Sequence, residues 1–166
     1  MSIKVSFINL SSIDFTGKHK TLAEEGLKTD ITYPGDFLAA RTGHQTMEID
    51  QEVLSWYVDG NMETWSTWMP TTDGGKTFST EGAFGVKTES PLQFLSIGKA
   101  PYWYAGHIKS GHNGYTWDIR DGHDKATPYT WAPAGKFTVL ATPVCHHKSI
   151  DIAVTITDLV KPMPGV

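Results

Sequence analysis

The sequence predicts an all-β protein, an antiparallel β-sandwich of jelly-roll-like form with at most one short helix. Short segments rich in β-branched and aromatic residues recur about every ten residues, which is a spacing typical of sandwich strands. Turn signals made of Gly, Pro, Asn and Asp separate these segments. No long stretch shows the periodicity of a helix, and no internal repeat indicates a propeller or a solenoid.

The length of the chain, 166 residues, suits one domain that buries a substantial core. Hydrophobic residues make up 39% and charged residues 19%, a balance that does not indicate disorder. No linker divides the sequence. We therefore expect a single β-sandwich domain over residues 1–160 and a loose C-terminal tail over residues 161–166.

The charge and the cysteine content limit which binding partners and which cellular compartment are expected for this chain. The net charge is −4 and no cluster of Lys and Arg is present, so a nucleic-acid partner is not expected. Cys145 is the single cysteine, so no intramolecular disulfide can form. Residues 1–20 lack a signal-peptide pattern, and no apolar run is long enough for a transmembrane segment. We expect a protein that is cytoplasmic as synthesised, with leaderless export left open.

The first third of the chain contains the one helical candidate. Residues 3–8 alternate apolar and polar side chains with a period of two, which predicts the first strand. Residues 9–16 are rich in turn formers. Residues 21–27 are the only candidate for a short helix, with a loop as the alternative, and residues 29–33 predict a strand that ends at a Pro-Gly breaker.

The middle of the chain predicts four or five strands. Residues 46–58 indicate one bent strand or two strands that end at an Asp-Gly turn. Residues 64–70 form one arm before another turn, and residues 83–86 and 92–97 are further short strands.

The last third predicts four strands. Residues 102–108 and 114–119 are expected to be strands joined by a turn over residues 110–114. Residues 136–144 and 150–159 are the last two. The final one shows the cleanest alternation in the chain, because four β-branched residues occupy every second position: Ile150, Ile152, Val154 and Ile156.

Residues 71–78, with the sequence TTDGGKTF, resemble the Asp-box, a hairpin motif known from sialidases and other β proteins. All defined positions of the motif match. The resemblance implies a β-hairpin in which Asp73 binds amides of the turn. It does not imply sialidase activity, because the box is a structural turn away from the active site in the proteins that carry it.

Residues 3–15, with the sequence IKVSFINLSSIDF, are similar to the opening of small β-sandwich lectins and cytolysins, including the aegerolysin and actinoporin-like groups. The likeness is that of a strand followed by Asn and Ser-Ser. It carries no family motif, so no site residue is taken from it.

Residues 99–131 form the most distinctive stretch, with three of the six tryptophans and four of the six tyrosines. Such rings can stack on sugars or lie among lipid headgroups. On a strand, Tyr104 and Trp103 face opposite ways, so part of the set is expected inside and part exposed. The candidate ligand-binding residues are Trp103, Tyr104, Tyr115, Trp117, Trp131, His112 and Asn113.

The same stretch contains a polar run that offers oxygen and imidazole ligands. Carboxylates could supply oxygens to Ca²⁺, and histidines with a carboxylate could bind Zn²⁺. The spacing matches no established metal motif, and a solvated turn is the alternative. No cofactor is therefore expected, with Ca²⁺ or Zn²⁺ left open on a set of four metal-site candidates: Asp118, Asp121, His123 and Asp124.

The function expected from these features is that of a non-enzymatic binding module that recognises carbohydrate or membrane-lipid headgroups through exposed aromatic residues on loops. One alternative is a metal-dependent hydrolase or isomerase that uses a His/Asp cluster within residues 107–124. Another is a self-assembling structural β protein, a homo-oligomer that buries exposed rings or pairs the edge strand at residues 150–159.

Overall fold

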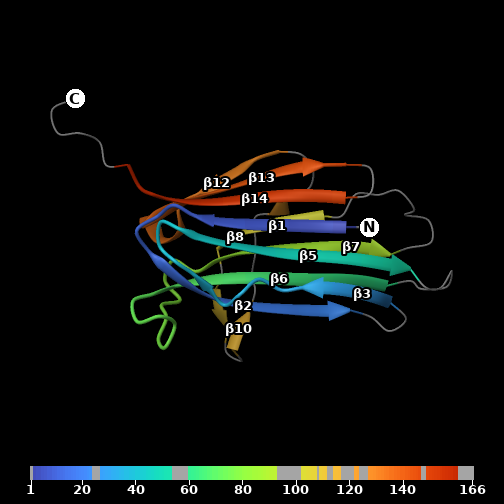
Figure 1. Cartoon of the computed structure of the whole chain (residues 1–166), viewed down its shortest axis with the longest axis horizontal. Coiled ribbons are helices and arrows are strands. Elements are labelled where there is room, and N and C mark those ends of the chain that lie inside the picture. Colours follow the sequence, from blue (N-terminus) through green and yellow to red (C-terminus); the bar gives the residue numbers. More distant parts are fainter. Residues whose placement is uncertain are drawn as a thin grey trace.

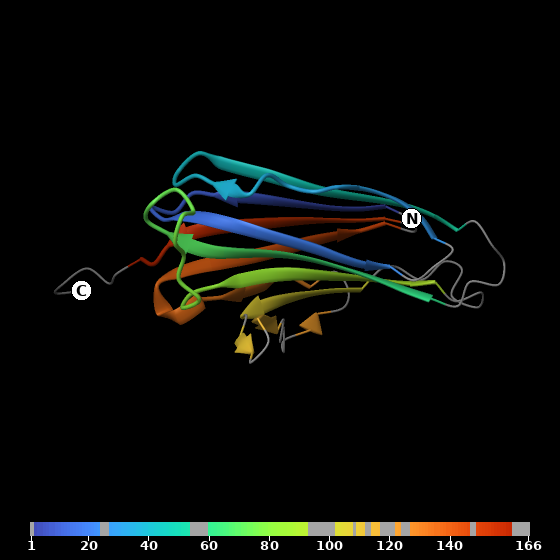
Figure 2. The same cartoon turned by 90° about the horizontal axis from the view of Figure 1, so that it is seen from below.

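The computed structural model describes residues 2–23, 27–53, 60–92, 102–107, 109–111, 114–116, 122–123, 127–146 and 149–160. It confirms an all-β sandwich. Two six-stranded sheets lie face to face, with their strands along the long axis of the molecule (Figures 1 and 2). We call them sheet A, which contains the first strand, and sheet B.

The strand order in sheet A, from one edge to the other, is β12 (Tyr129–Trp131), β13 (Phe137–Cys145), β14 (Ser149–Asp158), β1 (Ser2–Asn9), β5 (Gly43–Val53) and β3 (Leu27–Thr32). The order in sheet B is β11 (Gly122–His123), β8 (Tyr102–His107), β7 (Phe84–Leu92), β6 (Gly60–Thr71), β2 (Asp14–Ala23) and β4 (Phe37–Leu38). The remaining described elements are a short two-stranded ribbon and one turn of 3₁₀ helix: β9 (Lys109–Gly111), β10 (Gly114–Thr116) and η2 (Pro133–Gly135).

One pairing departs from the purely antiparallel arrangement expected. β1 and β14 run parallel in the middle of sheet A, with Ser2 opposite Ser149 and Asn9 opposite Ile156. On its other side β1 pairs antiparallel with β5. The other strand pairs described are antiparallel, including β13 with β14. Segments from the beginning and the end of the described chain therefore form the centre of one sheet.

The core lies between the two sheets, as the alternation in the sequence predicted. β1 and β14 bury every second residue, so Ile3, Val5 and Phe7 meet the inward side chains of sheet B. At one end of the sandwich, three phenylalanines meet edge to face with ring centroids 5.1–5.8 Å apart: Phe15, Phe84 and Phe137. Such contacts add to the hydrophobic stabilisation that burial provides.

The predicted helix at residues 21–27 is wrong. Residues 21–23 are the last residues of β2, and Thr21 pairs there with Thr64 of β6. Leu27 is the first residue of β3. Pairing between strands overrides a helical propensity that rests on so few residues. The turn-rich reading of residues 9–16 is also wrong at its end, because β2 begins at Asp14.

Other strands agree with the prediction in position and differ in length. β5 covers Gly43–Val53, while residues 54–58 of the expected strand or strands lie outside the described residues. β7 extends well beyond residue 86. At the turn expected over residues 110–114, Ser110 and Gly111 belong to β9, Gly114 begins β10, and residues 112–113 lie outside the described residues. The predicted strand at residues 92–97 lies outside the described residues from 93 onward, as do residues 117–119 of another strand and the tail at residues 161–166.

The Asp-box turn has the hydrogen bonds that the resemblance implies. The backbone amide of Thr77 donates to Asp73 Oδ1 at 2.8 Å, and its hydroxyl donates to Asp73 Oδ2 at 2.6 Å. The Thr71 hydroxyl donates to the Thr77 carbonyl at 2.6 Å. The Thr77 hydroxyl and amide lower the pKa of Asp73. The turn lies within a loop over residues 72–83 that joins β6 to β7, so its second arm is not a strand.

A buried amide ties the end of β1 to the loop before β5. Asn9 is fully buried, and its Nδ2 donates to the carbonyls of Ile13, Leu38 and Ala39 at 2.7, 3.2 and 3.1 Å. Its Oδ1 accepts from the backbone amide and the hydroxyl of Ser11. One side chain thus satisfies polar backbone groups from two separate segments, residues 11–13 and residues 38–39, which a buried structure requires.

Candidate functional site

Two of the predicted ligand-binding rings lie in the core, which corrects their assignment to an exposed site. Trp103 on β8 has an exposed fraction of 0% and faces the interior between the sheets. Trp131 on β12 has an exposed fraction of 7% and stacks on Tyr129 at a centroid distance of 5.0 Å. Neither ring offers a face to a ligand, because the apolar residues of both sheets surround them.

Tyr104 is the predicted ring that the structure places on the outside. It follows Trp103 on β8, so it points to the opposite side of sheet B and is partly exposed. Tyr115 pairs with Ser110 in the β9–β10 ribbon, and its side chain is outside the described part of the chain. Three further candidates, Trp117, His112 and Asn113, also lie outside the described residues.

Most residues of the predicted metal site lie outside the part of the chain that the structure describes. Asp118, Asp121 and Asp124 lie beyond the described residues, and His123 is described only by its backbone, which pairs with Trp103. Among the residues that the structure does describe, no group of three or more His, Cys, Asp or Glu side chains is arranged to hold a metal ion. The metal site therefore stays a prediction.

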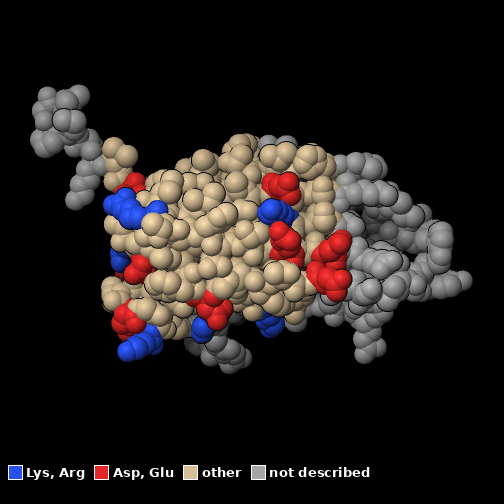
Figure 3. Space-filling view, in the orientation of Figure 1, with Lys and Arg blue, Asp and Glu red and all other residues tan. Residues whose placement is uncertain are grey.

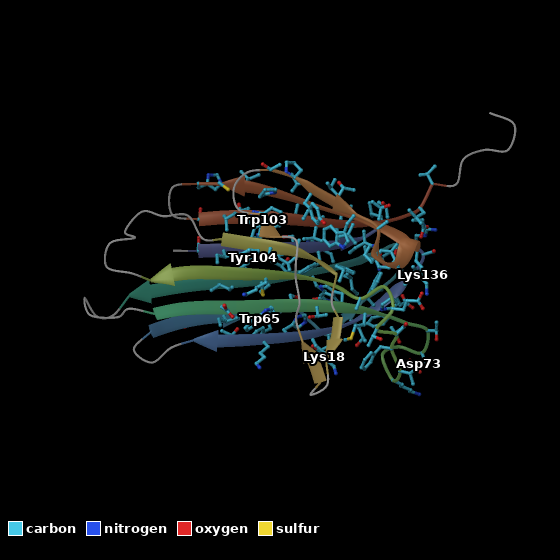
Figure 4. The ribbon with its side chains drawn as sticks, turned by 180° about the vertical axis from the view of Figure 1, so that it is seen from behind. Lys18, Trp65, Asp73, Trp103, Tyr104 and Lys136 are labelled. Carbon is cyan, nitrogen blue, oxygen red and sulfur yellow. The ribbon has the colours of Figure 1, made fainter. Side chains whose placement is uncertain are left out.

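The outer face of sheet B carries a row of residues that sequence analysis did not single out as a group. Lys20 lies opposite Trp65, Trp65 opposite Lys87, and Lys87 opposite Tyr104. The row crosses β2, β6, β7 and β8 at right angles to the strands, and cations alternate with aromatic rings along it. Figure 4 views the molecule from this side and labels both aromatic residues. We call these four residues the Lys-aromatic row.

The centre of the row is an ammonium group between two rings. Lys87 Nζ lies 5.5 Å from the ring centroid of Trp65 and 5.5 Å from that of Tyr104. It also lies 3.1 Å from Glu63 Oε1 on the neighbouring strand, and both charged side chains are mostly buried. Contacts of this kind contribute about 0.5–2 kcal/mol each. They hold the Tyr104 ring and the Lys87 ammonium in fixed positions on a rigid sheet.

Exposure differs along the Lys-aromatic row. Trp65 has an exposed fraction of only 7%, so it supports its neighbours more than it offers a surface. Lys20 is exposed, and Tyr104 and Lys87 are partly so. The accessible chemistry is therefore a tyrosine ring with cations on the same face, and a carboxylate beside them.

A second polar cluster lies on the inner side of β2. His19 Nδ1 is 2.8 Å from Ser66 Oγ, and His19 Nε2 is 3.8 Å from Asp36 Oδ1. The residue types match a Ser-His-Asp triad, yet Ser66 has an exposed fraction of 0%. No substrate carbonyl can reach that hydroxyl. We conclude that the cluster is structural and that it orients the His19 ring.

Burial sets the protonation of His19. Its side chain is 4% exposed, and desolvation lowers the pKa of the ring below the ordinary value of 6.5. The Gly35 backbone and the Asp36 carboxylate oppose this shift without cancelling it. The ring is packed between Tyr33 and Trp68, at centroid distances of 6.4 and 5.3 Å. His19 is therefore neutral at pH 7.

We expect the free energy of unfolding to fall as the pH is lowered from about 7.5 to about 5.5. In this range the unfolded chain binds a proton at His19 that the folded protein does not bind, so acid favours unfolding. His19→Gln should flatten this part of the pH profile, as measured by thermal unfolding across the range. His44→Gln, which changes an exposed histidine, should leave the slope as it is. An unchanged slope in the His19 variant would exclude this residue as the cause.

Comparison of the chain with known proteins identifies no family for it. No protein-family model matches the chain, and no curated protein matches it by sequence. In the part of the chain that is described, no helix has the length and apolar character needed to cross a membrane.

Proposed function

We propose that the protein is a non-enzymatic binding module that recognises carbohydrate or membrane-lipid headgroups with the outer face of sheet B. The observation that carries this proposal is the Lys-aromatic row, in which Tyr104 and Lys87 are held side by side on adjacent strands. The binding face is then a sheet surface, and not loops alone as the sequence suggested.

The chemistry of the row suits such ligands. A tyrosine ring gives a flat apolar surface for the C–H face of a sugar or for the upper part of a lipid. The Lys87 ammonium donates hydrogen bonds, and the Glu63 carboxylate beside it accepts them. Because the residues stand on paired strands, little conformational entropy is lost when a ligand binds. Tyr115, Trp117, His112 and Asn113 remain candidates for additional contacts.

We expect Tyr104→Ala to weaken ligand binding roughly five- to tenfold, because it removes the partly exposed ring of the row. Tyr104→Phe keeps the ring and should bind nearly as well as the original protein. A glycan array and vesicles of defined lipid composition would identify the ligand, and isothermal titration would then compare the variants.

The matched control is Tyr33→Ala, which removes an exposed tyrosine that contacts His19 and Thr21, on the face of β2 opposite to Lys20. This variant should bind as the original protein does. The proposal fails if no sugar or lipid binds the folded protein. It also fails if the ligand that does bind is held equally well after Tyr104→Ala.

A further inference from the structure

The two outer faces of the sandwich differ in charge, because the charged residues described on sheet A's face are mostly carboxylates and those on sheet B's face include three lysines and the Glu63 carboxylate. On the outer face of sheet A, four exposed carboxylate side chains gather toward one end, beside Lys4 (Figure 3): Asp30, Glu48, Asp50 and Asp151. On the outer face of sheet B, Lys18 and Lys20 are exposed on β2 and Lys87 lies on β7. A protein with a net charge of −4 thus presents cations on the face that holds its partly exposed tyrosine.

Two cations of the Lys-aromatic row stand on the same face of sheet B. Lys20 and Lys87 stand two strands apart, with Trp65 directly between them. Strands in a sheet are about 4.8 Å apart, so their backbones are about 10 Å apart. Lys20 makes no ion pair within the described part of the chain, so its charge is available to a ligand. Along the row, across the four strands, a lysine and an aromatic residue therefore alternate twice.

We infer that the ligand is an acidic polysaccharide, a linear chain with recurring carboxylate groups that lies across the strands along the Lys-aromatic row. This inference rests on the proposed function and specifies its ligand class. A sugar carboxylate pairs with the ammonium of Lys20, while a sugar ring farther along the same polymer, three strand spacings away, lies on Tyr104. The acidic outer face of sheet A repels the same polymer, so only one side of the sandwich binds it.

A lipid surface fits these observations less well. A membrane covers a broad area and attracts proteins through clusters of basic residues. Here two cations lie in a narrow row with one aromatic ring between them and a second ring at the end, and a carboxylate, that of Glu63, lies 3.1 Å from Lys87. Such an alternation matches a linear polymer that presents charged groups and ring faces in turn.

The test uses polygalacturonate and the same polymer with its carboxyl groups methyl-esterified, which keeps the sugar backbone and removes the negative charges. The full-length protein should bind the free-acid form, and added salt should weaken that binding. The esterified form should bind at least tenfold more weakly, because it lacks the groups that Lys20 recognises. Lys20→Gln should weaken binding to the free-acid form about tenfold and leave binding to the esterified form unchanged.

The control is Lys4→Gln, which makes the same change of charge on the outer face of sheet A, where Lys4 lies 3.7 Å from Glu48. It should not alter binding. Equal affinity for the two polymers would overturn the inference and leave the proposed function standing, and so would equal losses in the two lysine variants. Binding to anionic vesicles without binding to polygalacturonate would assign the face to lipid. If no glycan or vesicle binds, the proposed function fails as well.

Discussion

Asn9→Ala is expected to lower the free energy of unfolding by roughly 3–5 kcal/mol. The substitution removes a buried amide that donates to the carbonyls of Ile13, Leu38 and Ala39. Among the described residues, the Ala39 carbonyl keeps only the Gly43 amide as a donor, and the Ile13 carbonyl keeps a longer contact of 3.4 Å with the Ser11 hydroxyl. The substitution also removes the acceptor for the backbone amide of Ser11. Each buried group that loses its partner costs about 1–3 kcal/mol, since water cannot replace it without opening the structure. Urea unfolding followed by tryptophan fluorescence would measure the loss.

Two further variants separate the hydrogen bonds of Asn9 from its volume. Asn9→Asp keeps the shape and the acceptor oxygens, but it cannot donate to the three carbonyls and it buries a charge. It should destabilise at least as much as Asn9→Ala. Ser12→Ala breaks an exposed hydrogen bond to Asp158 in the same turn and should cost at most about 1 kcal/mol. A loss below about 1 kcal/mol in Asn9→Ala would show that the network is dispensable.

Gly43→Ala is expected to lower the free energy of unfolding by about 3 kcal/mol or more. The reason is that Gly43, the first residue of β5, packs closely on the backbone of the turn that precedes it. A Cβ on residue 43 would lie 2.5 Å from the carbonyl oxygen of Ala39 and 2.6 Å from its nitrogen. Both atoms belong to the backbone, and the Gly43 amide donates to that same carbonyl at 2.8 Å. The turn cannot move away without breaking this bond. Thermal unfolding would report the loss as a lower midpoint.

Gly35→Ala is the matched control for the substitution at Gly43. A Cβ at residue 35 also makes a close contact, at 3.0 Å, but with the end of the Gln45 side chain. That side chain can shift, because its hydrogen bonds to the Gly35 amide and the Phe37 carbonyl are exposed and water can replace them. The expected cost is therefore about 1 kcal/mol at most. Similar losses in the two variants would mean that the sandwich does not depend on the close backbone approach at Gly43.

The sequence predicted most of the strands because their signal is local. In β1 and β14 the apolar residues occupy alternate positions, and burial follows that alternation. The same rule placed Trp103 and Tyr104 on opposite sides of one strand, which the structure confirms. The rule could not say which side is the interior, so Trp103 was assigned to the site although it belongs to the core.

The Lys-aromatic row could not be predicted, because its residues come together only through the register of four strands. Lys20, Trp65 and Lys87 are far apart in the sequence, and a shift of one residue in any pairing would send one of them to the other face. The sequence favoured residues 99–131 because aromatic residues are dense there. Density along a chain does not show which rings share a surface.

The parallel pairing of β1 and β14 has a mechanical consequence. Because the two strands run in the same direction, the segments that leave the ladder before Ser2 and after Asp158 depart from opposite ends of it. Tension applied through those two segments would load the hydrogen bonds between the strands together, in shear. An antiparallel pair pulled from one end would instead open one bond after another. The pairing is therefore suited to resist stretching along the long axis of the sandwich, the axis along which the strands run.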